Sequence, residues 1–172
     1  FGAYAKDEDF PGHVLSINTI INRKGEIVKK VWKPRNIKRF YPTFEISTTT
    51  VETVQTRFRE KYGIDDEFPV VQTEFGNISV STAQLDPLVF NVFGMKGTEI
   101  MLRTSTLFFQ SDIVHTAMVN NYYSAMANIP YDSPYGGQSI IVSPNGETLA
   151  QVSSKTEEGF ASVVIPIGEF RK

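Results

Sequence analysis

Hydroxyl side chains gather at the end of one predicted strand. The segment 76-GNISVSTAQLDP-87 is typical of a strand that leads into a turn. Ser81 lies near the end of that strand, and a serine can attack a carbonyl carbon only where a base accepts its proton. Ala83 follows, and a methyl group cannot attack a carbonyl. The chain has no cysteine, which excludes disulfides, thiolate metal sites and thiol catalysis within it.

The sequence offers no clear base for such a serine and no metal motif. His13 and His115 are the two histidines, and His115 lies in a predicted helix close to Ser111 and Asp112. A Ser-His-Asp triad is recognised by its geometry, so neighbouring positions alone do not indicate one. There is no H-E-x-x-H motif, no set of carboxylates at calcium-loop spacing and no glycine pair that opens a helix. We therefore expect no metal and no cofactor.

Composition restricts the kinds of partner. The 172 residues suit a single domain, 1–172, and 41% apolar content is ordinary for a globular core. A net charge of −2 argues against nucleic acid or an anionic membrane as partner, since both require a basic face. No stretch of about 18 apolar residues predicts a membrane span. Phe1 opens the sequence without an initiator Met or a visible signal peptide, so we expect a cytoplasmic protein whose chain begins inside a longer parent.

Strand and helix signals alternate along the chain. β-branched residues in 14–21 and 26–33 flank the turn at 22–25, which predicts a hairpin. Asp86 can cap a helix and Pro87 suits its first position. The other expected elements are helices at 48–62, 86–96 and 111–121 and strands at 68–73, 77–83, 99–103, 122–128, 138–142, 147–152 and 160–165. This order indicates a layered α+β domain.

Four stretches in sequence order resemble the nitrilase, or carbon–nitrogen hydrolase, superfamily. They are 18-NTIINRKGEIVKKVWK-33, 76-GNISVSTA-83 followed by 94-GMKGTEIMLR-103, 120-NNYYSAMAN-128 and 135-YGGQSIIVSPNGETLAQ-151. The third of these is most similar to the aliphatic-amidase and formamidase branch. No single motif is diagnostic, but the ordered set covers almost the whole chain.

The resemblance implies a fold and a reaction class. The fold is a four-layer α-β-β-α sandwich of the α+β class, here without its N-terminal part. The reaction is attack on a nonpeptide C–N bond of a small amide or nitrile through a thioester. Members of the family use a glutamate as general base, a cysteine as nucleophile and a lysine that stabilises the negative charge of the tetrahedral intermediate.

The family's lysine corresponds to Lys33, at the end of the hairpin strand. The family's cysteine corresponds to Ala83 when the strands are matched, and to Ser81 when the alignment is anchored on Pro87. Two residues are missing between these anchors, so the nucleophile turn is remodelled. We favour Ala83 and keep Ser81 as the alternative nucleophile position.

Two acidic residues of the family have no counterpart in this sequence. The general-base glutamate belongs to a segment upstream of residue 1. A second glutamate of the amidase branch corresponds to Lys38 if 40-FYP-42 is the anchor. That change reverses the charge in a pocket meant for a neutral amide, which counts against ordinary amidase chemistry.

Three functional hypotheses follow. In the first, the protein is a homologue that has lost catalysis and acts as a scaffold or regulatory subunit. In the second, it is an amidohydrolase seen as a truncated or Cys-substituted form. In the third, Ser81 and Lys33 support a serine variant of the reaction. The remodelled turn and Lys38 favour the first.

The helix predicted after the turn is apolar on most faces, which indicates that it is covered on more than one side. Its apolar residues are Leu88, Val89, Phe90, Val92 and Phe93. In the family that the chain resembles, this helix and the next one form the subunit interface. We therefore expect a homodimer or larger homo-oligomer through helices 86–97 and 111–121.

Overall fold

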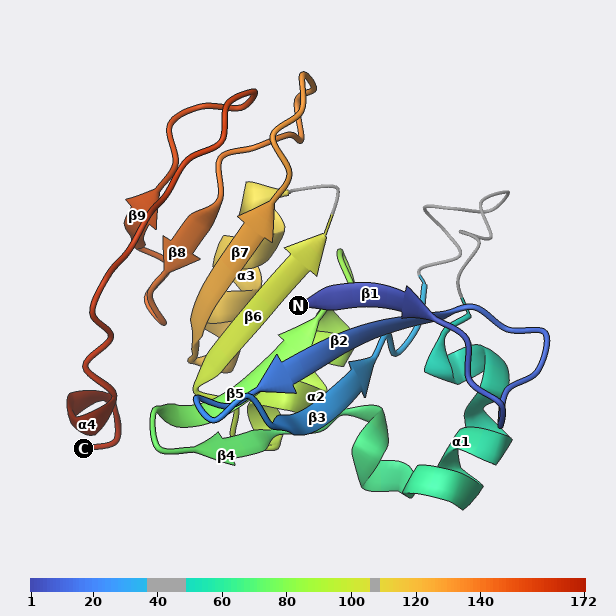
Figure 1. Cartoon of the computed structure of the whole chain (residues 1–172). Coiled ribbons are helices and arrows are strands. Elements are labelled where there is room, and N and C mark those ends of the chain that lie inside the picture. The colour runs from blue at the N-terminus through green and yellow to red at the C-terminus, as the bar shows by residue number, and fades with distance from the viewer. Residues whose placement is uncertain (37–48, 106–108) are drawn as a thin grey trace.

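Two β-sheets lie one in front of the other in the computed structural model, which describes residues 1–36, 49–105 and 109–172 (Figure 1). The smaller sheet is antiparallel and contains β1 (Gly2–Ala5), β2 (Leu15–Ile21) and β3 (Ile27–Trp32) in that order. The larger sheet contains, in order, β4 (Val71–Thr73), β5 (Gly76–Ser81), β6 (Ile100–Ser105), β7 (Tyr123–Asn128), β8 (Ile140–Val142) and β9 (Thr148–Gln151). The Thr104 hydroxyl donates to the Asn18 side-chain carbonyl at 2.8 Å and links the two sheets.

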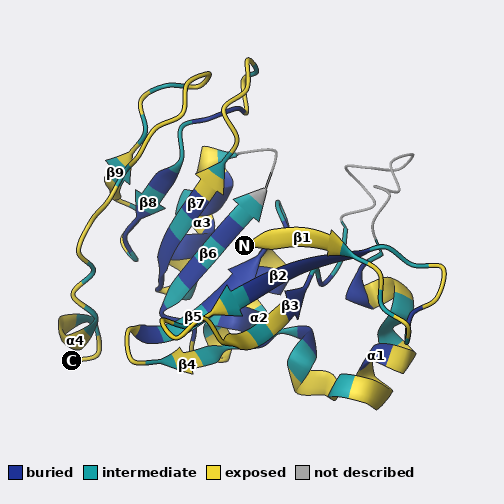
Figure 2. Ribbon diagram, viewed as in Figure 1, coloured by how far each residue is buried: buried dark blue, intermediate teal, exposed yellow. Residues whose placement is uncertain are grey.

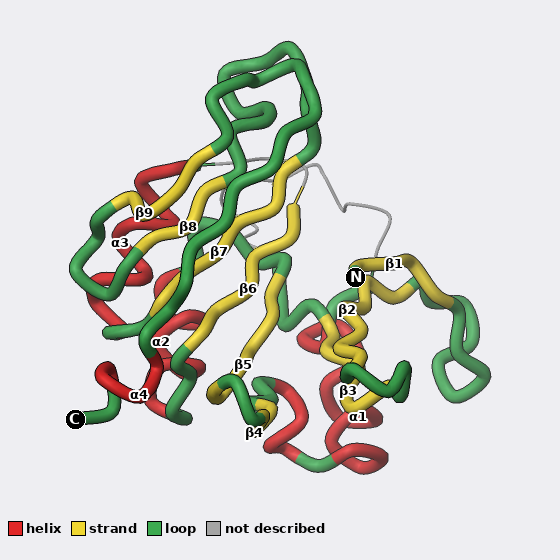
Figure 3. Tube along the Cα trace, turned by 60° about the vertical axis from the view of Figure 1, so that its left-hand side comes forward, coloured by secondary structure: helices red, strands yellow, loops and turns green. Residues whose placement is uncertain are grey.

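The central strands of the larger sheet are parallel, and helices make the crossovers between them. β5 pairs with β6 and β6 with β7 in parallel, while β4, β8 and β9 join antiparallel. α2 (Pro87–Met95) connects β5 to β6, and α3 (Gln110–Asn120) connects β6 to β7. Both helices lie on the face turned away from the smaller sheet (Figures 1 and 3). Parallel neighbours need such long connections, because a tight turn reverses the strand direction.

α1 (Gln55–Tyr62), preceded by a 3₁₀ helix at Val51–Val54, packs on the other face of the smaller sheet. Phe58 of α1 joins Ile17 and Trp32, which are cross-strand partners and so share one face. The layers therefore follow the order α2/α3, larger sheet, smaller sheet, α1. The predicted four-layer α-β-β-α arrangement of the α+β class is confirmed.

Two apolar cores join the sheets to their helices, and their residues are buried (Figure 2). The larger core lies between the larger sheet and α2 and α3, and its buried residues are Ala83, Val89, Phe90, Phe93, Met101, Ile113, Ala117, Tyr122, Met126, Ile140 and Val142. The smaller core lies beneath α1 and contains Phe10, Leu15, Ile17, Trp32, Val51 and Phe58. Burial of each large apolar side chain contributes about 1.5–3 kcal/mol.

Local signals in the sequence act as predicted at two places. The Asn22 side chain accepts from the amides of Lys24 at 2.9 Å and Glu26 at 3.0 Å, and Gly25 has φ of 82°, so the hairpin turn is confirmed. Asp86 accepts from the Val89 amide at 3.4 Å at the start of α2, with Pro87 at the first helical position.

Other predicted elements differ from the structure. Residues 160–165 form no strand, although their β-branched residues favour one. A strand needs a hydrogen-bonded neighbour, and in the part of the chain that the structure describes no strand pairs with these residues. They lead instead into the short helix α4 (Ile167–Phe170). β1 was not predicted, and the helix expected from residue 48 becomes regular only at Gln55. A 3₁₀ helix at Ile64–Glu67 follows it.

None of the helices in residues 1–36, 49–105 and 109–172 combines the length and apolarity needed to cross a membrane.

Candidate functional site

The carboxyl ends of the parallel strands meet at one edge of the larger sheet, where α/β proteins commonly place their ligand sites. Ser81 at the end of β5 is in register with Arg103 of β6, and Arg103 is in register with Met126 of β7. The turn that carries residue 83 leaves the sheet at this edge. The site is therefore built from the ends of separate strands, which the fold brings together.

Side-chain and backbone groups hold the turn after β5 tightly. The Ser81 hydroxyl oxygen accepts from the Ala83 amide at 3.1 Å. Ser81 is 0% exposed and Ala83 is 2% exposed. Leu85 has φ of 52°, in the left-handed region that residues other than glycine rarely occupy. Such backbone conformations persist where the surrounding structure enforces them, and they concentrate at functional sites.

Arg103 supports this turn from inside the protein. Its Nη2 donates to the carbonyl oxygen of Ala83 at 2.9 Å and to the Asp112 carboxylate at 2.6 Å. Its Nη1 donates to the Thr116 hydroxyl at 3.3 Å. The guanidinium carbon lies 3.9 Å from the centre of the Phe90 ring, a cation–π geometry. Both backbone polar groups of Ala83 are thus bonded to side chains.

A second ion pair connects the strand end that carries Lys33 to the same turn. Arg35 Nε donates to Asp86 Oδ2 at 2.5 Å, and Arg35 Nη2 donates to Asp86 Oδ1 at 2.7 Å. Asp86 is buried, and its carboxylate also caps α2. The hydrogen bonding that the Arg35 guanidinium donates to Asp86 raises the pKa of this guanidinium, which stays charged at all ordinary pH values.

Lys33 lies directly after β3 and is half-buried. Its amide donates to the Ser16 carbonyl at 2.9 Å, and its carbonyl accepts from the Val51 amide at 3.0 Å. Burial lowers the pKa of its ammonium group. Within residues 1–36, 49–105 and 109–172 no carboxylate forms an ion pair with it. A half-buried ammonium without an anionic partner is suited to receive negative charge.

The structure thus places Lys33, Ser81 and Ala83 on segments that the pair of Arg35 and Asp86 ties together. Their roles in binding or chemistry stay predictions. The interpretation of Lys38 with the anchor 40-FYP-42 lies outside the described residues.

Sequence reasoning overlooked the support of this site. The segment 94-GMKGTEIMLR-103 carries part of the family resemblance, but its sequence predicts no role for Arg103. A charged residue inside the apolar strand 100-IMLRTS-105, followed by Asp112 near the start of the next helix, is the signal that could have revealed the buried pair.

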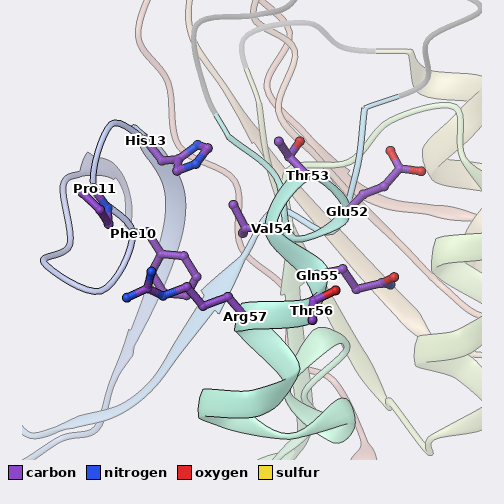
Figure 4. Close-up of a pocket in the computed structure, with 9 residues that line it drawn as sticks. All are labelled: Phe10, Pro11, His13, Glu52, Thr53, Val54, Gln55, Thr56 and Arg57. Atoms are coloured by element: carbon purple, nitrogen blue, oxygen red, sulfur yellow. The ribbon is translucent and has the colours of Figure 1, made fainter.

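A separate pocket of about 440 Å³ lies between the loop that contains Phe10 and His13 and the start of α1 (Figure 4). Arg57 extends beside the Phe10 ring, with its guanidinium carbon 5.7 Å from the ring centre. His13 Nδ1 lies 2.9 Å from the Thr49 hydroxyl oxygen. Ser81, Ala83 and Lys33 do not line this pocket. Across the described residues, no group of three or more histidine or carboxylate side chains could hold a metal ion.

The sequence model of the family described as carbon–nitrogen hydrolase matches residues 10–172. The chain belongs to the carbon–nitrogen hydrolase family. The resemblance seen in the four motifs is thereby confirmed. No curated protein matches the chain.

Solved structures of the nitrilase superfamily share the fold at low sequence identity. Nit3 of Saccharomyces cerevisiae aligns with a TM-score of 0.73 and 18% identity over 99% of this chain and 60% of Nit3. A carbon–nitrogen hydrolase of Helicobacter pylori gives 0.68 and 19%, over 91% of this chain and 57% of that one. A cysteine-to-alanine mutant of the amidase from Nesterenkonia sp. AN1, in complex with butyramide, gives 0.63 and 16%, over 92% and 57%.

At identities of 16–19%, these comparisons show that the fold is shared. The present chain spans about three fifths of the length of these proteins.

Proposed function

We propose that this chain is a carbon–nitrogen hydrolase homologue that binds a small amide without cleaving it and serves as a scaffold or regulatory subunit. The observation that carries the proposal is the residue at the nucleophile position. Ala83 occupies the turn after β5, and a methyl group cannot form the thioester on which the family's reaction depends. A cytoplasmic location is part of this proposal.

The hydrogen bonding of Ser81 argues against the serine alternative. Its hydroxyl oxygen accepts from the Ala83 amide at 3.1 Å, and the residue is fully buried. A nucleophilic serine needs its oxygen free to meet the substrate and a base that takes its proton. In the structure this oxygen instead stabilises the turn.

Retained amide binding is supported by the half-buried Lys33 and by a relative. The amidase from Nesterenkonia sp. AN1 has an active-site cysteine, and its cysteine-to-alanine mutant has been crystallised with butyramide. In that protein an alanine variant is therefore found with an amide. The alanine at position 83 is compatible with the same behaviour here.

The deciding experiment measures turnover and binding in the same full-length protein. We expect no ammonia release from formamide, short aliphatic amides or nitriles, but saturable binding of butyramide by calorimetry. Lys33→Met should weaken that binding, whereas Lys30→Met, at an exposed position three residues earlier, should not. Absence of binding in the unaltered protein would contradict the proposal.

Two outcomes would instead favour the alternatives. Ammonia release that Ser81→Ala abolishes would favour the serine variant. Appearance of ammonia release in Ala83→Cys would reject a degenerate scaffold and favour an amidohydrolase in substituted form, because the rest of the machinery would then be intact.

We further propose a homodimer or larger homo-oligomer through α2 and α3. The side of these helices that faces away from the sheet exposes large apolar residues, with Leu88 63%, Met95 89%, Met118 52% and Val119 53% exposed. A large exposed apolar patch commonly marks a protein interface, and we propose that these side chains form one.

A further inference from the structure

Arg103 is a buried cation in the interior of the protein, where its charge is paired with Asp112. Its side chain is 1% exposed, and that of its partner Asp112 is 6% exposed. A buried ion pair is a costly way to stabilise a fold, since well-packed apolar residues of similar volume often do as well. The groups to which the guanidinium donates hydrogen bonds therefore need to be considered as the reason for the pair.

The guanidinium joins four parts of the structure at one point. It belongs to β6, it donates to Asp112 and Thr116 of α3, and it lies over Phe90 of α2. It also donates to the carbonyl oxygen of Ala83, at 2.9 Å. The planar fork of arginine can serve these acceptors together, which the single ammonium of a lysine cannot do with the same geometry.

The two bonds to Ala83 act on the two peptide planes that flank its Cα. The Ser81 hydroxyl holds the amide on one side, and Arg103 holds the carbonyl on the other. Because peptide units are planar, two fixed planes also set the direction of the bond from Cα to Cβ. The side chain at position 83 consequently has one direction available.

We propose that Arg103 is a positioning residue for position 83: held by Asp112 and Thr116, it fixes the direction in which the side chain of residue 83 leaves the turn. This inference rests on the proposed function only in taking position 83 as the point where a ligand is met. It does not depend on whether the chain has lost catalysis.

The absence of cysteine from the sequence makes a direct test possible, because Ala83→Cys creates a single thiol in the chain. The full-length protein is compared with and without Arg103→Lys in this background. The measurement is the limiting rate of alkylation by iodoacetamide at position 83, followed by mass spectrometry of the peptide that contains it, at a pH where the thiol is fully ionised. Under this condition the rate reports accessibility alone. We expect Arg103→Lys to raise this rate about tenfold or more, because release of the carbonyl lets the buried turn open.

The matched control is Arg171→Lys, which alters the bidentate pair that Arg171 forms with Glu99 near the opposite end of β6. It should leave the limiting rate within about twofold. An equal rise in both variants would indicate general loosening of the fold and would overturn the positioning role. An unchanged rate in Arg103→Lys would overturn it as well.

Hydrogen exchange on the unaltered protein measures how well the amides of the turn are protected, and this measurement does not require a variant to fold. Amides of residues 82–85 should exchange about as slowly as those of β5, although they lie in a turn. Fast exchange there would contradict the inference. The ammonia and butyramide measurements decide the proposed function separately, so failure of one idea does not imply failure of the other.

Discussion

Arg35 and Asp86 are joined by two hydrogen bonds, of 2.5 and 2.7 Å, although 51 residues separate them in the sequence. Arg35 follows the strand end that carries Lys33, and Asp86 begins α2 directly after the turn that carries Ala83. One carboxylate thus caps a helix and also holds two halves of the candidate site together. The pair holds the segment that carries Lys33 next to the turn that carries Ala83, so these two residues need no direct contact with each other.

Replacement of Asp86 should be costly for this reason. Asp86→Ala removes both the helix cap and the partner of Arg35, and we expect a loss of about 1–3 kcal/mol in the free energy of unfolding. Urea denaturation measures it. The control Asp65→Ala removes a carboxylate that is 94% exposed and paired with Lys96, and it should cost less than about 0.5 kcal/mol. Similar losses in the two variants would contradict a special role for Asp86.

The half-buried ammonium of Lys33 should make the free energy of unfolding depend on pH in the alkaline range. Its pKa is lowered in the folded state by burial, so between that value and the unfolded value the unfolded chain binds more protons. The free energy of unfolding therefore rises with pH across this window, because the poorly solvated ammonium of Lys33 loses its proton in the folded protein. The free energy of unfolding of Lys33→Met should not show this rise with pH.

At neutral pH, Lys33→Met should be slightly more stable than the unaltered protein, by less than about 1 kcal/mol because the side chain is only half-buried. Urea unfolding at several pH values from neutral to 10.5 should show the advantage of the variant shrinking. Lys30→Met, at an exposed position, serves as control and should show no such trend. A pH-independent difference for Lys33→Met would refute the expectation.

Glu99 should contribute stability that is lost in acid. The guanidinium of Arg171 lowers the pKa of the Glu99 carboxyl, and the Asn77 amide, which donates to it at 2.6 Å, acts in the same direction. A group whose pKa is lowered by folding stabilises the protein above its unfolded pKa, and this contribution disappears as pH falls through the folded value.

Glu99→Gln should therefore cost about 1 kcal/mol at pH 7, a modest figure because the partner Arg171 is half exposed. The difference from the unaltered protein should begin to shrink as the pH falls below the ordinary glutamate value of about 4.3, and it should vanish once the pH is below the lowered pKa of the folded state. Thermal unfolding across this range measures it. A difference that persists in strong acid would mean that packing, and not charge, explains the effect.

The exposed apolar residues of α2 and α3 predict the assembly state. Met95 is 89% exposed on α2, and Met95→Glu places a charge in the proposed interface. We expect the dissociation constant of the dimer to rise by about tenfold or more, since burial of an unpaired charge is unfavourable. Light scattering over a dilution series measures it.

Phe75→Glu provides the matched control for this experiment. Phe75 is 62% exposed in the turn between β4 and β5, outside both helices. Phe75→Glu should leave the dissociation constant of the dimer unchanged. A monomer in the unaltered protein at all concentrations would contradict the proposed assembly.

Short-range features were predictable because their partners lie nearby in the chain. Asn22 forms bonds with amides two and four residues away, and Asp86 bonds an amide three residues away. The order of motifs identified the family and, through it, the layered fold. The same reasoning predicted a strand at residues 160–165, which the structure leaves unpaired, because a strand also needs a neighbour that its own sequence does not reveal.

The sequence alone therefore determined the family, the local turns and caps, and the presence of alanine where a nucleophile would be expected. Only the tertiary structure decided that Arg103 holds the Ala83 carbonyl, that Arg35 pairs with Asp86, and that Ser81 is buried with its hydroxyl oxygen engaged. The physical reason is the separation of the bonded residues along the chain. Caps and turns are bonds between residues a few positions apart, whereas these contacts join segments that only the packing of separate strands and helices brings within hydrogen-bonding distance.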